Sequence, residues 1–266
     1  MGNVIKTMCS LNEKIFKVFP CLKRSSKKPY EEMHGELKAR DEEIVNLYKG
    51  NNEQEHYTGL LHIEQTKVEP LYLTVKNKSS YEAVFKDLIG ELDLLKQAIE
   101  TYLNKQHMLP EDVQKPVTHL IKNVEMFQKR LEMAQQVNDS NFVRTSDYRE
   151  AAREKFTYLF REHFISKCMQ IVNDGLRVEE KKPFYLEIGK LFNAFLAKKG
   201  IYTKIFKLYD EIDFELLIPE AKKSTNDEAL NGRIADLYML PYFFNDSNYQ
   251  GHALISEGIC AAYSTQ

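Results

Sequence analysis

The residues of this chain that could bind a metal or act as nucleophiles are scattered along it. Its 266 residues include seven histidines and four cysteines, and none of the cysteines forms a CxxC pair. Glu31 and His34 have the best spacing for two metal ligands, because residues three apart share one face of a helix. Charged residues surround this pair, so we interpret it as ordinary solvated surface. Cys168 and Cys260 lie in apolar runs, which is typical of reduced thiols packed in a core.

No short motif of an enzyme occurs in the sequence. HExxH, GxSxG, the Walker A loop and GxGxxG are all missing. We therefore expect a protein that is not an enzyme and that needs no cofactor and no metal, although an active site built from distant residues would leave no such motif. The formal net charge is −2 and basic residues alternate with acids, so we do not expect nucleic acid as a partner.

Helices are the elements that must position any functional site. Residues 81–103 and 113–134 carry apolar side chains at i, i+3 and i+4, and Pro110 stands between them. This pattern predicts two amphipathic helices joined as an antiparallel hairpin. We expect Ser79 or Ser80 to cap the first helix of the pair.

The chain as a whole is expected to be α+β and mostly α, with amphipathic helical hairpins or a bundle followed by a small C-terminal β-rich unit. Residues 145–175 and 183–200 predict a second helical hairpin, and residues 30–50 predict an exposed helix. The predicted parts are an amphipathic helix with a basic linker (1–29), a polar helical and connecting region (30–78), a helical bundle (79–200) and a small β-rich domain (201–266).

The N-terminal part combines an apolar helical stripe with a basic flank. The stripe consists of Val4, Ile5, Met8, Leu11, Ile15, Phe16 and Phe19, and the flank contains Lys23, Arg24, Lys27 and Lys28. This combination is typical of a helix that lies in the interface of an anionic membrane. The other interpretation is a helix docked on the rest of the protein or on a partner. Because charges interrupt the apolar stretch, we expect neither a secretory signal nor a transmembrane helix.

Helical periodicity ends after residue 200, and short apolar runs separated by turn residues follow it. Apolar runs bounded by Asn, Asp, Gly and Ser are typical of strands. We predict a compact, mainly antiparallel β unit over residues 212–264 that can be separated from the helices near Gly200. Asn231-Gly232 and residues 245–248 are expected to form its hairpin turns.

A series of short pieces follows in the last third of the chain. They are Ala197-Lys198-Lys199-Gly200-Ile201, Asp213-Phe214, Pro219-Glu220-Ala221, Asn226-Asp227-Glu228 with Gly232, Ile234-Ala235-Asp236-Leu237, Pro241-Tyr242 and residues 254–261. Their order and spacing resemble the end of GrpE, the family of nucleotide exchange factors that serve DnaK-type chaperones. The resemblance covers residues 184–264, and Pro219 stands where the family has a histidine.

The resemblance implies a non-enzymatic exchange factor or co-chaperone whose small β domain contacts the ATPase of a DnaK-type chaperone. Such a factor would bind the open state of the nucleotide cleft more tightly than the closed state. The resemblance also implies a homodimer formed through helices. The partner-binding residues that it implies are Glu220, Gly232, Leu237 and Tyr242.

The alternative function is a peripheral membrane-associated helical scaffold or adaptor, anchored by its N-terminal amphipathic and basic segment. Both functions fit a cytoplasmic protein, and the second would place it at the inner face of a membrane. Lipidation of Gly2, Cys9 or Cys21 stays open at this point.

Overall fold

The computed structural model describes residues 30–50, 60–106, 110–136, 148–246 and 253–265. The chain divides into two compact units, residues 1–50 and residues 51–266. The apolar stripe and basic flank expected to dock on a membrane or a partner, residues 4–28, lie outside the described residues. In the first unit α2 (Tyr30–Gly50) forms the predicted helix. None of the helices that the structure describes has both the length and the apolar character needed to cross a bilayer.

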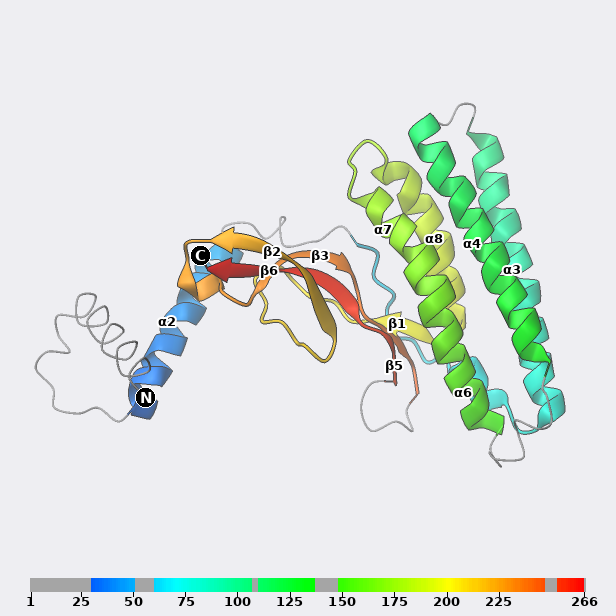
Figure 1. Ribbon diagram of the computed structural model, residues 1–266, viewed down its shortest axis with the longest axis horizontal. Coiled ribbons are helices and arrows are strands. Elements are labelled where there is room, and N and C mark those ends of the chain that lie inside the picture. The colour runs from blue at the N-terminus through cyan, green and yellow to red at the C-terminus, as the bar shows by residue number, and fades with distance from the viewer. Residues whose placement is uncertain (1–29, 51–59, 107–109, 137–147, 247–252, 266) are drawn as a thin grey trace, which may run out of the picture. The chain divides into compact units, whose positions relative to one another are not determined.

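The second unit contains the predicted helical bundle, shown in Figure 1. Two long helices, α3 (Lys78–Lys105) and α4 (Glu111–Gln135), run antiparallel, since Tyr81 bonds to the carbonyl of Ala134 and Lys96 pairs with Glu125. The residues that they bury are those of the predicted stripes: Tyr81, Val84, Phe85, Leu88, Leu92, Leu95 and Ile99 on α3, and Val113, Val117, Leu120, Val124, Phe127 and Leu131 on α4. The hairpin prediction is confirmed, and so is the fold class.

The cap of α3 differs from the sequence-based expectation. Asn77 is the N-cap, and its side chain accepts a hydrogen bond of 2.9 Å from the backbone N–H of Ser80. The hydroxyl of Ser80 accepts in return from the backbone N–H of Asn77, at 2.9 Å. The prediction of a cap at Ser79 or Ser80 was therefore wrong, because Ser80 completes a reciprocal capping box from the third helical position.

The third predicted helix is present but changes its pitch. α6 (Tyr148–Leu159) continues directly into a π-helix, η3 (Phe160–Met169), and then into α7 (Gln170–Leu176). Buried residues follow one another in steps of four through this region: Phe156, Phe160, Phe164, Cys168 and Val172. On an α-helix each such step drifts by about 40° around the axis. In the wider turn of a π-helix the same step drifts in the opposite sense, so the two drifts offset each other and all five side chains stay on the core side.

The π-helix fills the aromatic centre of the bundle. The Phe164 ring lies 5.0 Å from that of Phe127 on α4, and 5.4 Å from that of Phe192 on α8 (Lys182–Lys198), measured between ring centroids. α8 also packs on α7, which gives the second predicted pair of helices. A single buried cluster therefore joins the two hairpins.

The strands form two sheets of three strands each. β1 (Ile201–Thr203), β4 (Tyr242–Phe244) and β5 (Ala253–Ser256) form an antiparallel sheet in the order β1-β4-β5. In the other sheet β6 (Gly258–Thr265) lies between β2 (Leu217–Thr225) and β3 (Ile234–Met239). The pairing of β2 with β6 is parallel, whereas β3 with β6 is antiparallel. Three of the four described strand pairings are antiparallel, as predicted, but the longest is parallel. The single compact unit predicted over residues 212–264 is replaced by two sheets, and the first of them includes β1, which precedes residue 212.

The turn predicted at Asn231-Gly232 exists, but it does not close a hairpin. Gly232 has φ +78°, which favours glycine, and η4 (Glu228–Leu230) precedes it. β2 and β3, on either side of this turn, are separated by β6. The turn bonds to that central strand instead, because the N–H of Gly232 donates to the carbonyl of Tyr263 at 2.9 Å.

An extended segment, residues 60–70, fastens the first sheet to the helices, and we call it the strap. The backbone N–H of Ile63 donates to the hydroxyl of Thr203 at 2.9 Å, and the N–H of Thr203 donates to the carbonyl of Ile63 at 3.0 Å. The strap also runs so close to Gly200 (φ +68°) that a Cβ there would lie 2.7 Å from the carbonyl carbon of Glu69. The short 3-10 helix η2 (Leu71–Thr74) follows and leads to α3.

One apolar cluster includes side chains of the helices, the strap and both sheets. Phe244 of β4 shows this directly, since its ring lies 6.3 Å from that of Phe160 on η3 and 5.1 Å from that of Tyr72 on η2. Many contacts therefore cross residue 200. The separability of the β unit at that point stays a prediction.

Candidate protein-binding surface

The structure distributes the four predicted partner-binding residues between surface and core. Glu220 on β2 and Gly232 in the turn before β3 are exposed. Leu237 and Tyr242 are each only 1% exposed. Burial also raises the pKa of the Tyr242 hydroxyl far above its usual value, so it stays neutral. We correct the assignment for these two residues: their side chains pack in the core and have no surface to offer a partner.

Three apolar side chains in and before β2 are exposed. Phe214 is 72% exposed, Ile218 is 45% exposed and Ile205 is 51% exposed. An ion pair of 3.9 Å between Lys204 and Asp213 holds the segment containing Ile205 beside the segment containing Phe214. We call Ile205, Phe214, Ile218 and the neighbouring Glu220 the β2 surface. Apolar groups exposed together in this way are typical of a protein contact.

A tight turn sets the direction of Phe214. The carboxylate of Asp213 accepts from the N–H of Glu215 at 3.1 Å, and the carbonyl of Asp213 accepts from the N–H of Leu216 at 3.0 Å. Leu216 and Leu217 then enter the core, each less than 10% exposed. Because the chain is fixed on both sides of it, Phe214 cannot retreat into the core without breaking this turn.

The segment that precedes this turn is also fixed to the sheet. Tyr209 has φ +67°, a left-handed conformation that costs a non-glycine residue about 1–2 kcal/mol. The buried Arg233 donates to the carbonyl of Tyr209 at 3.1 Å and to that of Ala229 at 3.0 Å. The Tyr209 ring stacks on Tyr263 of β6, with 5° between the ring planes. These contacts offset the strain and make the base of the β2 surface rigid.

The outer edge of β2 is poorly suited to bind another strand. Among the described strands β2 pairs only with β6. Pro219 lacks an N–H, a bulge lies between Pro219 and Ala221, and Lys222 and Lys223 follow. Proline, bulges and lysine are devices that protect a sheet edge from further pairing. A partner of the β2 surface would therefore contact its side chains and would not pair with the backbone of β2.

Arg177 at the end of α7 connects this sheet to the helices. Its guanidinium donates to the carboxylate of Asp236 at 2.6 Å and to the carbonyl of Leu237 at 3.2 Å. It also lies 4.3 Å above the ring of Tyr238. A cation that is bonded and stacked at once fixes the direction of β3 relative to α7. No local sequence pattern indicates this contact, because Arg177 and Asp236 are 59 positions apart.

The titratable residues of the described part do not form a metal-binding group. It contains no cluster of three or more His, Cys, Asp or Glu side chains that could hold a metal ion. Cys168 and Cys260 are fully buried, as expected of core residues. Burial raises the pKa of Cys260 to about 11 and that of Cys168 further, which keeps both thiols protonated and unreactive.

The chain matches no protein-family model, no curated protein and no solved structure. The resemblance to GrpE consequently rests on the sequence pieces alone.

Proposed function

We propose that this chain is a non-enzymatic protein-binding factor, and that the β2 surface contacts its partner. The observation that carries the proposal is Phe214, which is 72% exposed on a hydrogen-bonded turn four residues before the exposed Ile218. An aromatic side chain that is exposed to water is unfavourable in the free protein. Its burial in a complex removes a large apolar area from water. Glu220 on the same strand adds a charge that a partner can recognise.

The GrpE-like pieces support a more specific form of this proposal. In it the partner is a DnaK-type chaperone ATPase, and the chain acts as its nucleotide exchange factor. The β2 surface would bind the open state of the nucleotide cleft better than the closed state and so increase the open population. This mechanism requires a contact surface and no catalytic side chain on this chain. A homodimer through the helices belongs to the same proposal.

The test measures release of labelled ADP from a DnaK-type ATPase of the same cell. The intact chain should accelerate release, and the double variant Phe214→Ser with Ile218→Ser should not. Leu94→Ser is the matched control, because Leu94 is a 63% exposed apolar residue on α3, far from β2 in the sequence. Deleting residues 212–266 is a poor test, since Tyr242 and Phe244 help to form the core shared with the helices.

Two results would count against this proposal. No acceleration by the intact chain would exclude exchange activity on that ATPase. Equal acceleration by the double variant and by Leu94→Ser would show that the β2 surface is not the contact.

A peripheral membrane-associated scaffold is the second candidate, supported by the apolar stripe and basic flank of residues 4–28. Replacing Ile15 and Phe16 with Ser removes about 3–6 kcal/mol of apolar burial if both are fully covered. Co-sedimentation with anionic vesicles should then fall although every basic residue is retained. If the intact chain does not co-sediment with such vesicles, residues 4–28 bind a protein instead.

A further inference from the structure

The solvent side of α4 combines methionines with basic residues. Lys122, Met126 and Met133 follow at spacings of four and seven, which places them on one face of the helix. Met126 is 49% exposed and Met133 is 67% exposed. Methionine is flexible and polarizable, and exposed methionines are typical of surfaces that adapt to a partner.

The basic residues of this face have acidic neighbours, but two of these acids form their ion pairs elsewhere. Glu125 pairs with Lys96 at 2.7 Å, although the charge of Lys122 also acts on it, and Glu162 pairs with Arg161 at 2.9 Å. Within the described part of the chain, Lys122, Arg130 and Lys167 form no ion pair. Their charges are therefore available to an incoming anionic group.

The charges of α4 and η3 belong to one region. Burial is the first cause of a lowered pKa at His163 on η3, and the positive charges of Arg130 on α4 and of Lys167 lower it further, against the opposing effect of Glu162. Both cations must lie near this imidazole to act on it. A hydrogen bond of 3.1 Å from the Asn123 side chain to the Lys167 carbonyl fastens the two helices together at this point.

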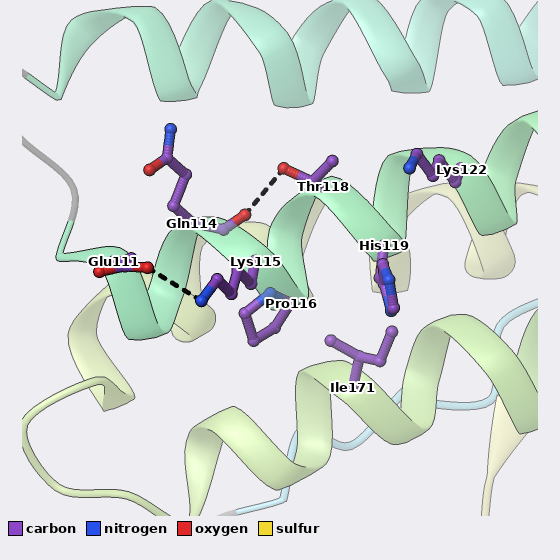
Figure 2. Close-up of a pocket in the computed structure, with 8 residues that line it drawn as sticks. All are labelled: Glu111, Gln114, Lys115, Pro116, Thr118, His119, Lys122 and Ile171. Carbon is purple, nitrogen blue, oxygen red and sulfur yellow. Dashed lines mark hydrogen bonds and ion pairs between the residues drawn. The ribbon is translucent and has the colours of Figure 1, made fainter.

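A groove continues this surface between α4 and α7. It is open, has a volume of about 590 Å³, and is lined mainly by the first turns of α4 and by Ile171. Figure 2 shows Pro116 and His119 pointing toward Ile171, which gives the groove an apolar part. Lys115 and Lys122 also line it, and Lys115 pairs with Glu111 at 2.9 Å.

We propose that this region, the α4–η3 surface, binds an acidic amphipathic helix of a partner protein. The residues that define it are Lys122, Met126, Arg130, Met133, His163 and Lys167. The apolar side of a partner helix would meet the methionines and Ile171, and its carboxylates would meet Lys122, Arg130 and Lys167, which form no ion pair in the described part of the chain. A bilayer is less suitable, because a flat surface cannot reach the floor of a groove between two helices. This inference does not depend on the β2 surface.

The experiment uses the full chain and three synthetic peptides, with fluorescence anisotropy as the measurement. The probe is an amphipathic helical peptide of Glu and Leu. Its controls are the same composition in scrambled order and a version with Lys in place of Glu. We expect only the amphipathic Glu peptide to bind, and more weakly as salt is added. Equal binding of the scrambled peptide, or no binding of the Glu peptide, overturns the proposal.

Variants then locate the contact on the protein. Lys122→Glu with Arg130→Glu should weaken peptide binding by about tenfold or more, and Met126→Ser with Met133→Ser should weaken it less. Lys86→Glu is the matched control, because Lys86 is an exposed lysine on α3 without an ion pair in the described structure. An equal effect of Lys86→Glu overturns the assignment to this surface. So does charge reversal that abolishes binding to phosphatidylserine vesicles but leaves peptide binding unchanged.

Discussion

The two sheets come from interleaved stretches of the same chain, yet they differ in what covers them. Every residue of β1 and β4 is buried, whereas most residues of β2 are exposed. The first sheet packs on η3, α8 and the strap, so its side chains act as core. The second sheet contacts the helices mainly through β3 and Arg177. Substitutions should therefore affect stability in the first sheet and binding in the second.

The largest expected loss of stability comes from removing a buried side chain between the first sheet and the helices. Phe244→Ala removes a ring that packs on Phe160 and Tyr72, and it should lower the free energy of unfolding by about 3–5 kcal/mol. Ile218→Ala on β2 should change it by about 0.5 kcal/mol or less, because Ile218 is 45% exposed. Urea unfolding of both variants measures the difference. Similar losses would show that the two sheets are covered alike.

A smaller effect is expected at the strap. Thr203→Val keeps the shape of a 2% exposed side chain but leaves the N–H of Ile63 without its acceptor, which should cost about 1–3 kcal/mol. Thr66→Val is the control, since the Thr66 hydroxyl accepts from the N–H of Val68 at an exposed position. If the two valine variants unfold at the same urea concentration, the strap does not contribute to the stability of the first sheet.

The smallest expected effect is a pH dependence at the same place. His62 bonds through Nδ1 to the hydroxyl of Thr203 at 3.0 Å; burial lowers its pKa below the usual 6.5, and the charge of Glu64 opposes this. The unfolded chain then binds more protons, so stability should fall as pH drops through 6.5 and should not change above it. His62→Gln should reduce this fall between about pH 7.5 and pH 5.5 in thermal unfolding. If the stability of the His62→Gln variant falls equally steeply as the pH drops, the pH dependence belongs to other groups, such as His163.

The candidate site could be predicted only in part. Glu220 and Gly232, which the resemblance assigned to a partner, are both exposed, and their role stays a prediction. The resemblance also assigned Leu237 and Tyr242 to a partner, although both are buried. A short apolar strand has the same sequence pattern whether its covering surface is the rest of the chain or another protein. Phe214 belonged to one of the GrpE-like pieces but was not assigned to a partner, and its exposure follows from the turn at Asp213.

The sequence by itself determined the positions of the bundle helices, the antiparallel pairing of α3 with α4 and the α+β composition. Helical periodicity is local, so each stripe marks its own buried face. Only the tertiary structure decided that β6 lies between β2 and β3, that Arg177 holds β3, and that the strap bonds to β1. These contacts join residues far apart in the chain, such as Ile63 and Thr203, which are 140 positions apart. No local pattern specifies such a pairing, because it depends on which surfaces remain uncovered after the helices have packed.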